Sequence, residues 1–170
     1  MIREVSGDIL LSKAAMIAHG VGPDDDFRQG LALALRERWP DLYRDFRHWC
    51  HTSHPKAGDV WLWSGLGPNG PVRIASLLTQ DAPARKGEHA GRARAELVNA
   101  ALRGLVGVVE KEKPTSLALP RLATGVGGLE WAVVRPLVEK HLGKLSIPVE
   151  LYTRYVAGQA AVDAAVAGRA

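Results

Sequence analysis

Short apolar runs of strand length alternate with longer amphipathic segments along this chain, and this alternation limits its fold more than any other feature. The expected strands are residues 2–5, 15–19, 60–63, 72–78, 117–119 and 149–152. Elsewhere apolar residues recur every three or four positions, which predicts helices at residues 30–38, 41–50, 92–112 and 131–142. Helices between strands act as crossover connections, which make a sheet largely parallel and cover both its faces. The sequence therefore predicts an α/β fold in three layers.

The segment between residues 60–63 and 72–78 predicts a hairpin. It contains the only Gly-x-Gly-x-x-Gly string of the chain, at residues 65–70. A dinucleotide-binding fingerprint with this spacing lies between a strand and a helix, whereas this string lies between two strands and includes Pro-Asn-Gly. We therefore expect a turn here and no dinucleotide site.

Length and composition indicate one domain, which we place at residues 1–156. The Ala/Gly-rich end, residues 157–170, has few large apolar side chains and is expected to be a frayed helical tail. A single cysteine, Cys50, excludes a disulfide framework and a multi-cysteine zinc site. No apolar run approaches 18 residues and the opening lacks a signal-peptide core, so we expect a cytoplasmic protein with no membrane partner. The net charge of +4 gives a mild attraction to anions.

Glycines gather at two junctions where a strand is followed by a helix. The first is Gly20-Val21-Gly22, and the second is Thr124-Gly125-Val126-Gly127-Gly128. Such loops expose backbone N–H groups at the positive end of a helix dipole and therefore suit phosphate. The alternative is that both are tight turns only. No Gly-Lys-Ser/Thr follows either loop, which excludes a Walker A site.

Two polar clusters invite a metal interpretation that the sequence does not favour. His48, Cys50, His51 and His54 lie together, but no second cluster has ligand spacing, so a polar helix end is the simpler interpretation. Asp24-Asp25-Asp26 is typical of a solvated loop, although Asp24 lies beside the first glycine loop. We expect neither a metal nor a cofactor.

The glycine loops and their flanks resemble one known family. Val5-Ser6-Gly7-Asp8-Ile9-Leu10, residues 19–32 and Leu119-Pro120-Arg121 through Gly128-Leu129-Glu130-Trp131 resemble the opening and the two phosphate loops of macrodomains. The resemblance spans residues 1–155. It implies a three-layer α/β/α fold with a mixed, mostly parallel central sheet that binds ADP-ribose. The second loop is most similar to the branch that contains terminal ADP-ribose protein glycohydrolase and the antitoxins that remove ADP-ribose from DNA.

The resemblance also implies roles for individual residues. Asp8 would accept the adenine amino group with the Ile9 N–H beside it, and Tyr152 would pack on the adenine face, unless it is only a core tyrosine. The N–H groups of the two glycine loops would surround the diphosphate and the distal ribose. The full set expected to bind ADP-ribose is Asp8, Ile9, Gly20, Val21, Gly22, Gly30, Leu31, Thr124, Gly125, Val126, Gly127, Gly128, Leu129 and Tyr152.

At the catalytic positions the sequence departs from this branch. Gln80 follows the strand-ending Thr79 where the branch has a lysine, and Gly127 takes the place of an aspartate. A glutamine cannot form a Schiff base, so we expect no covalent lysine intermediate unless Lys86 reaches in from its loop. Hydrolysis through an oxocarbenium-like state remains open, with Asp24 or Gln80 orienting the water.

These observations predict an ADP-ribosyl hydrolase that releases ADP-ribose from modified protein side chains, such as carboxylates, or from nucleic acid. Its partners would be ADP-ribose and ADP-ribosylated protein or nucleic acid. One alternative is a reader module that binds ADP-ribose without catalysis. Another is a nucleic-acid-binding protein that uses the basic balance with Trp61, Trp63 and Arg85.

Overall fold

A single mixed sheet of seven strands organises the protein. The computed structural model describes residues 1–67 and 70–164. Their strands lie in the order β3-β4-β2-β5-β6-β1-β7. The bounds are β1 Ile2–Gly7, β2 Met16–Val21, β3 Val60–Gly67, β4 Gly70–Leu78, β5 Leu117–Pro120, β6 Val149–Tyr155 and β7 Val162–Asp163. The five central strands run parallel, and the two edge strands β3 and β7 run antiparallel to their neighbours. The predicted mixed, mostly parallel sheet is confirmed.

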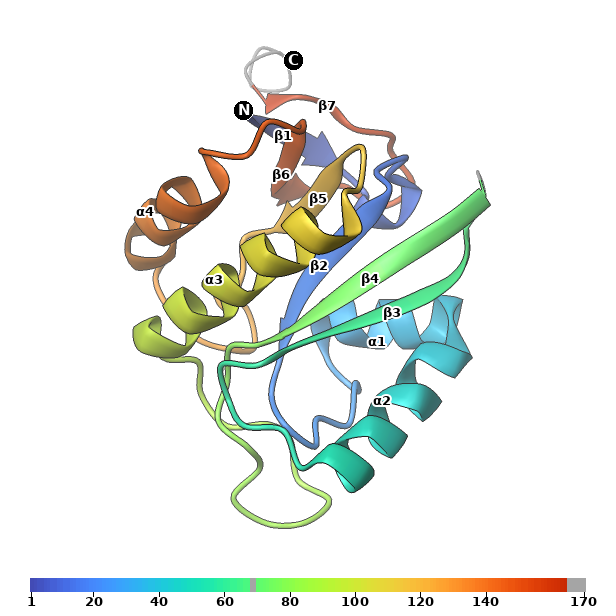
Figure 1. Cartoon of the computed structure of the whole chain (residues 1–170), viewed down its shortest axis with the longest axis vertical. Helices are drawn as coiled ribbons and strands as arrows, with labels where there is room; N and C mark the ends of the chain where they lie inside the picture. Colours follow the sequence, from blue (N-terminus) through green and yellow to red (C-terminus); the bar gives the residue numbers. More distant parts are fainter. Residues whose placement is uncertain (68–69, 165–170) are drawn as a thin grey trace.

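Four α-helices cover the two faces of this sheet. They are α1 Gly30–Arg38, α2 Pro40–Ser53, α3 Ala95–Glu112 and α4 Trp131–Leu142, and a short 3-10 helix, η1 Ile9–Leu11, follows β1. Figure 1 shows α3 and α4 on one face and α1 and α2 on the other. The predicted three-layer α/β/α fold is therefore confirmed. None of the helices in the described part of the chain is long and apolar enough to cross a membrane.

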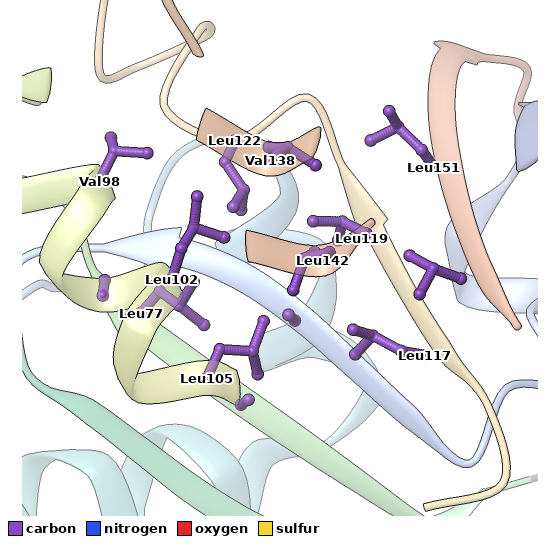
Figure 2. Packing of buried hydrophobic residues seen from close by; sticks show 14 of the residues in the cluster. Leu77, Val98, Leu102, Leu105, Leu117, Leu119, Leu122, Val138, Leu142 and Leu151 are labelled. Carbon is purple, nitrogen blue, oxygen red and sulfur yellow. The ribbon is translucent and has the colours of Figure 1, made fainter. Parts of the chain in front are cut away.

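An aliphatic core fills the space between the sheet and the helices α3 and α4. Leu102 and Leu105 of α3 meet Val138 and Leu142 of α4 above Leu119 of β5 (Figure 2). All five side chains are fully buried. Burying one such side chain contributes roughly 1.5–3 kcal/mol. The apolar spacing that predicted these helices is thus the spacing of this core.

The opposite face of the sheet has an aromatic core. Phe46 of α2 packs on Phe27 with ring centroids 4.8 Å apart, and Trp49 of α2 stacks on Trp61 of β3 at 5.7 Å. Phe27 is fully buried although it belongs to the loop after β2. This loop is therefore anchored by packing. Trp61 and Trp63 are both partly buried and pack against this core, which weakens the nucleic-acid alternative.

The predicted hairpin and most helix bounds agree with the structure. β3 and β4 pair from Val60↔Leu77 to Gly67↔Gly70, and residues 68–69 between them lie outside the described residues. Helix α3 begins at Ala95 and not at residue 92, because the preceding residues return to the sheet. Ala93 forms an isolated bridge with Gln80, and the Arg94 N–H donates to the Thr79 carbonyl at 3.3 Å.

The prediction of a frayed helix at the C-terminal end is wrong for residues 162–163. They form β7, which pairs with Val5 and Ser6 of β1. Before it, the Gly158 N–H donates to Asp8 Oδ2 at 2.9 Å and the Asp8 N–H donates to the Gln159 carbonyl at 2.8 Å. The sheet edge and a buried carboxylate thus hold a segment whose composition lacks large apolar side chains. Residues 165–170 of the predicted tail lie outside the described residues.

Candidate functional site

The sheet opens between the neighbouring parallel strands β2 and β5. β2 pairs with β4 over six positions, from Met16↔Arg73 to Val21↔Leu78. It pairs with β5 only at Met16↔Leu117 and Ile17↔Ala118. The chain then leaves β2 toward α1 on one face and leaves β5 toward α4 on the other. Such a switch point, at the carboxyl ends of parallel strands, is where open α/β sheets bind ligands.

A cleft made of two adjoining cavities lies at this opening. The first has a volume of about 270 Å³ and is lined by the ends of β2, β5 and β6 and by the segments that follow β2, β4 and β5. The second has a volume of about 420 Å³ and is lined mainly by apolar residues around the end of β1 and the start of α1. They share the residues Gly30, Leu31, Pro120, Tyr152 and Tyr155. Together they have the size of a small-molecule site, roughly 300–1,000 Å³.

The loop after β5 offers a row of free hydrogen-bond donors. Thr124, Gly125, Val126 and Gly127 all line the first cavity. Their backbone N–H groups donate to no protein group among the described residues. The loop is held instead by its neighbours, since the Leu129 N–H donates to the Ala123 carbonyl at 2.9 Å. Consecutive free N–H groups in a concave loop form an anion-binding nest.

Helix α1 starts against the same cavity. It has no side-chain N-cap, and its first residues Gly30, Leu31 and Ala32 line the cavity. The first N–H groups of a helix have no partner within the helix and lie at the positive end of its dipole. A Cβ placed on Gly30 would lie 3.6 Å from Val126 Cγ2, so α1 and the second loop face each other across the cleft. An anion placed between them would meet donors from both sides.

The loop after β2 uses its donors internally. The Asp25 carboxylate accepts from the Gly22 N–H at 3.0 Å and from the Phe27 N–H at 2.9 Å. Asp26 Oδ1 accepts from the Arg28 N–H at 3.1 Å. Burial raises the pKa of Asp25, and the hydrogen bonds from Phe27 and Gly22 oppose that shift. The first glycine cluster is therefore not a second nest: Gly20 and Val21 end β2, and the Gly22 N–H is occupied.

The structure brings most of the predicted ADP-ribose-binding residues to the cleft. Those that line it are Ile9, Gly20, Val21, Gly30, Leu31, Thr124, Gly125, Val126, Gly127 and Tyr152. Those that line neither cavity are Asp8, Gly22, Gly128 and Leu129. Tyr152 is both a core residue and a wall of the cleft, and burial raises its pKa.

Asp8 lies just behind the second cavity. Its neighbours Gly7 and Ile9 line that cavity, and Asp8 itself is buried. Oδ1 accepts from the Leu10 N–H at 3.0 Å and Oδ2 accepts from the Gly158 N–H at 2.9 Å. Each carboxylate oxygen has a second lone pair, so the predicted contact with an adenine amino group stays a prediction.

The three predicted catalytic residues lie in different environments. Gln80 is buried and lines the first cavity, with Nε2 donating to the Gly91 carbonyl at 2.9 Å. Asp24 and Lys86 are exposed and line neither cavity. Of the three, only Gln80 is placed to meet a ligand.

Gly127 is a glycine for a steric reason. A Cβ at this position would lie 2.6 Å from the Ala123 carbonyl oxygen and 2.8 Å from Ala93 Cβ. This backbone cannot accommodate a side chain, so the aspartate of the resembling branch has no place here.

Sequence reasoning missed several residues of the cleft. His89 and Asp26 line the first cavity, with His89 Nδ1 3.1 Å from Asp26 Oδ2. Arg121 lines the same cavity and is exposed, and Tyr155 lies where the two cavities meet. Arg121 and Asp26 belong to motifs that the sequence analysis singled out, so proximity to those motifs was an available signal. His89 lies three positions after Lys86, in the loop from which the sequence analysis considers that Lys86 could reach the site, but no motif marks the imidazole itself.

A second histidine of the cavity is structural. His19 is buried, and its Nε2 lies 2.7 Å from Ser76 Oγ on the neighbouring strand β4. Burial lowers the pKa of His19 to about 3. Its ring packs edge-on against Phe27 with centroids 5.5 Å apart. A neutral His19 therefore supports the first loop from beneath.

The described residues contain no group of three or more His, Cys, Asp or Glu side chains that could hold a metal ion.

The chain was compared in sequence with protein families and with known proteins. No family model matches the chain. It is 29% identical over 159 residues to a "DNA ADP-ribosyl transferase-DNA ADP-ribosyl glycohydrolase fusion protein" of Thermosipho africanus. This match covers 87% of the chain and 40% of the relative. The chain likewise spans 39% of the DNA ADP-ribosyl glycohydrolase of Thermus aquaticus, so it corresponds to less than half of these relatives.

Solved structures also match this chain over most of its length. The macrodomain of Mycobacterium tuberculosis DarG superposes with a TM-score of 0.79 at 22% identity, over 89% of this chain and 97% of that one. Thermosipho africanus DarTG in complex with ADP-ribose superposes with a TM-score of 0.77 at 25% identity, over 94% of this chain and 42% of that one. The first shows the fold, and the second is a relative whose structure contains ADP-ribose. The chain therefore has the macrodomain fold, and in sequence it is similar to the DNA ADP-ribosyl glycohydrolases over less than half of their length.

Proposed function

We propose that this macrodomain binds ADP-ribose in the cleft between β2 and β5 and hydrolyses the bond that joins ADP-ribose to a modified acceptor. The acceptor would be a protein side chain, such as a carboxylate, or a nucleic-acid base. The relatives named as DNA ADP-ribosyl glycohydrolases and the relative with bound ADP-ribose support this proposal.

The observation that carries the proposal is the row of free N–H groups facing the uncapped start of α1. Thr124 to Gly127 supply donors from one side, and Gly30 to Ala32 supply donors from the other. A diphosphate has charged oxygens on both phosphorus atoms and suits donors on two sides. Arg121 adds a cationic side chain at the same wall.

The second cavity suits the adenosine end. It is lined by Ile9, Leu10, Leu31 and Ala34, with Tyr152 and Tyr155 at the junction with the first cavity. Tyr155 is 68% exposed, so an aromatic face is available to stack on a base. The distal ribose would then lie in the first cavity, beyond the diphosphate, near Gln80 and His89.

Hydrolysis would proceed without a covalent lysine intermediate. Gln80 cannot form a Schiff base, and Lys86 is exposed and away from both cavities. Cleavage at the anomeric carbon develops oxocarbenium character, which the adjacent diphosphate would stabilise. Held geometry and fixed N–H dipoles contribute the rest.

Two measurements on the intact protein test the proposal. Isothermal titration calorimetry should show saturable ADP-ribose binding with a Kd in the micromolar range or below. Incubation with ADP-ribosylated protein and with ADP-ribosylated DNA should then release free ADP-ribose from at least one of them. Absence of binding contradicts the proposed site, and binding without release contradicts the enzymatic part.

The reader alternative rests on Gln80 and Gly127, which replace the reactive pair of the resembling branch. It expects ADP-ribose binding with no release from either substrate at high protein concentration. The same two measurements therefore distinguish the hydrolase from the reader.

A further inference from the structure

The loop of residues 81–92 brings one imidazole to the wall of the first cavity. The base of this loop is closed by hydrogen bonds from the Asp81 N–H to the Arg92 carbonyl at 3.0 Å and from the Gly91 N–H to the Asp81 carbonyl at 2.8 Å. Gln80 Nε2 also donates to the Gly91 carbonyl. His89 is two residues from this anchored base and lines the cavity. Figure 1 shows the loop at the end of the sheet where β2 and β4 finish.

Asp26 orients this imidazole from across the cavity mouth. Asp26 Oδ2 is 3.1 Å from His89 Nδ1, and the Asp26 side chain is only 17% exposed. Oδ1 accepts from the Arg28 N–H, and Arg36 Nη1 donates to the Asp26 carbonyl at 2.8 Å. Asp26 is thus fixed at its side chain and its backbone. A carboxylate on Nδ1 keeps the proton there and leaves Nε2 as the basic nitrogen.

Two other titratable side chains of the cavity, Asp25 and His19, already have protein partners. Asp25 accepts two backbone N–H groups, and His19 is buried against Ser76 with a pKa lowered to about 3. The Arg121 guanidinium has only donor groups and no acceptor atom for a proton from water. His89 Nε2 has no protein partner among residues 1–67 and 70–164, and the His89 side chain is 53% exposed.

We propose that His89 is a catalytic residue that takes the proton from the attacking water, that Asp26 is its positioning residue, and that the preferred substrate carries ADP-ribose on a carboxylate. This inference rests on the proposed function. The water oxygen bonds to the anomeric carbon of the distal ribose while the bond from that carbon to the acceptor oxygen breaks. His89 Nε2 receives the water proton, and the carboxylate leaves with the electron pair of the broken bond. The proton is later lost to solvent, and no group is oxidised or reduced.

The choice of a carboxylate follows from the absence of a matching acid. A carboxylate departs as a stable anion and needs no proton, whereas a nucleobase nitrogen is a poorer leaving group and is helped by one. Besides Asp25, Asp26 and His19, the titratable side chains that share the described lining of the first cavity with His89 are Arg121, Tyr152 and Tyr155, and guanidinium and phenol groups are weak proton donors. One base without an acid therefore suits an ester-type linkage.

The test is single-turnover release of ADP-ribose from a glutamate-modified peptide, with ADP-ribose affinity measured for each variant. H89Q should reduce the release rate at least about 100-fold, the lower end for removal of a general base. Its Kd for ADP-ribose should stay within about threefold of wild type. D26A should lower kcat about tenfold with little change in KM, because it removes the carboxylate that orients His89 Nδ1 and leaves the N–H donors of residues 124–127 in place.

Chemical rescue distinguishes a His89 that acts as a base from a His89 that only holds the loop of residues 81–92 in place beside the cavity. Free imidazole should raise the release rate of H89A in proportion to its concentration and should leave wild type unchanged. The matched control is E88Q, an exposed neighbour that lines neither cavity and should behave as wild type.

Each outcome decides the inference. If wild type releases ADP-ribose and H89Q is equally fast, or if H89A is not rescued, the role of His89 is wrong while the proposed function stands. If wild type binds ADP-ribose but releases none, both the hydrolase and the inference fail. Faster release from ADP-ribosylated DNA than from the glutamate-modified peptide overturns the substrate class.

Discussion

The loops that follow β2 and β5 are each associated with a Gly-Val-Gly string, at residues 20–22 and 125–127, and differ in how they use their backbone donors. In the loop after β2, the N–H groups of Gly22, Phe27 and Arg28 bond to the loop's own aspartates. In the loop after β5, residues 124–127 keep their N–H groups free of protein partners within the described chain. The second loop has no carboxylate between Arg121 and Leu129. Carboxylates inside a glycine-rich loop therefore consume the donors that would otherwise bind a ligand anion.

The loops also differ in what anchors them. Phe27 holds the first loop in the aromatic core, in ring contact with His19, Tyr43 and Phe46. The second loop places Val126, which is 49% exposed, at its tip. The first loop thus acts as a framework that positions the start of α1, and the second presents the anion site.

Replacing Phe27, which anchors the first loop in the aromatic core, should have the largest effect, and this effect is on the free energy of unfolding. F27A should lower the free energy of unfolding by about 3–5 kcal/mol, the usual cost of emptying a buried phenylalanine site. V126A in the other loop should change it by less than about 0.5 kcal/mol, as exposed substitutions do. Urea denaturation followed by tryptophan fluorescence measures both. A loss below about 1 kcal/mol for F27A would mean that packing does not hold the first loop.

Adding a charge to the second loop should abolish binding without affecting the fold. A Cβ at Gly125 meets no atom within 4 Å, so G125D fits the structure. Its carboxylate would lie in the nest and repel the diphosphate, raising the Kd for ADP-ribose at least about 100-fold, or about 2.7 kcal/mol. Calorimetry measures this change, and the melting temperature should stay within a few degrees.

The matched control is G107D, which adds the same charge at an equally open position on α3, away from the cleft. It should bind ADP-ribose as wild type does. Equal affinity of G125D and G107D would remove the second loop from the anion site. A variant at Gly127 cannot serve here, because its side chain would collide with Ala123 and Ala93.

The sequence was sufficient to predict the layers, and the physical reason lies in periodicity. The spacing of Leu102, Leu105, Val138 and Leu142 is the spacing of one buried face, so the pattern and the core are the same observation. The tail was predicted as a helix because Ala and Gly dominate it. Its actual position depends on hydrogen bonds from Gly158 and to Gln159 at Asp8, which no local pattern records.

The site was predictable where one loop makes it and unpredictable where two loops meet. Residues 124–127 form a nest by themselves, and their glycines marked them. The pairing of Asp26 with His89 joins segments 63 positions apart, and neither segment alone indicates that the two side chains meet. Gly22 does not line the cleft, and the Asp25 carboxylate occupies its N–H group. The sequence indicates Asp25 only as part of a solvated acidic cluster and so does not reveal this contact.

Protonation of His19 should weaken the first loop selectively in acid. The pKa of His19 is lowered from 6.5 to about 3 by burial, so between these values the unfolded chain binds a proton that the folded chain excludes. The free energy of unfolding is therefore at its full value, as far as His19 is concerned, above pH 6.5, and it decreases as the pH falls from 6.5 toward 3. For one such group the free energy of unfolding should be about 2 kcal/mol lower at pH 5 than at pH 7.

H19Q removes the titrating ring and should therefore lose this difference, although it is less stable overall, whereas H48Q at an exposed position should keep it. Equal pH slopes for wild type and H19Q in urea denaturation would show that the neutral ring beneath Phe27 does not govern the acid response of this loop.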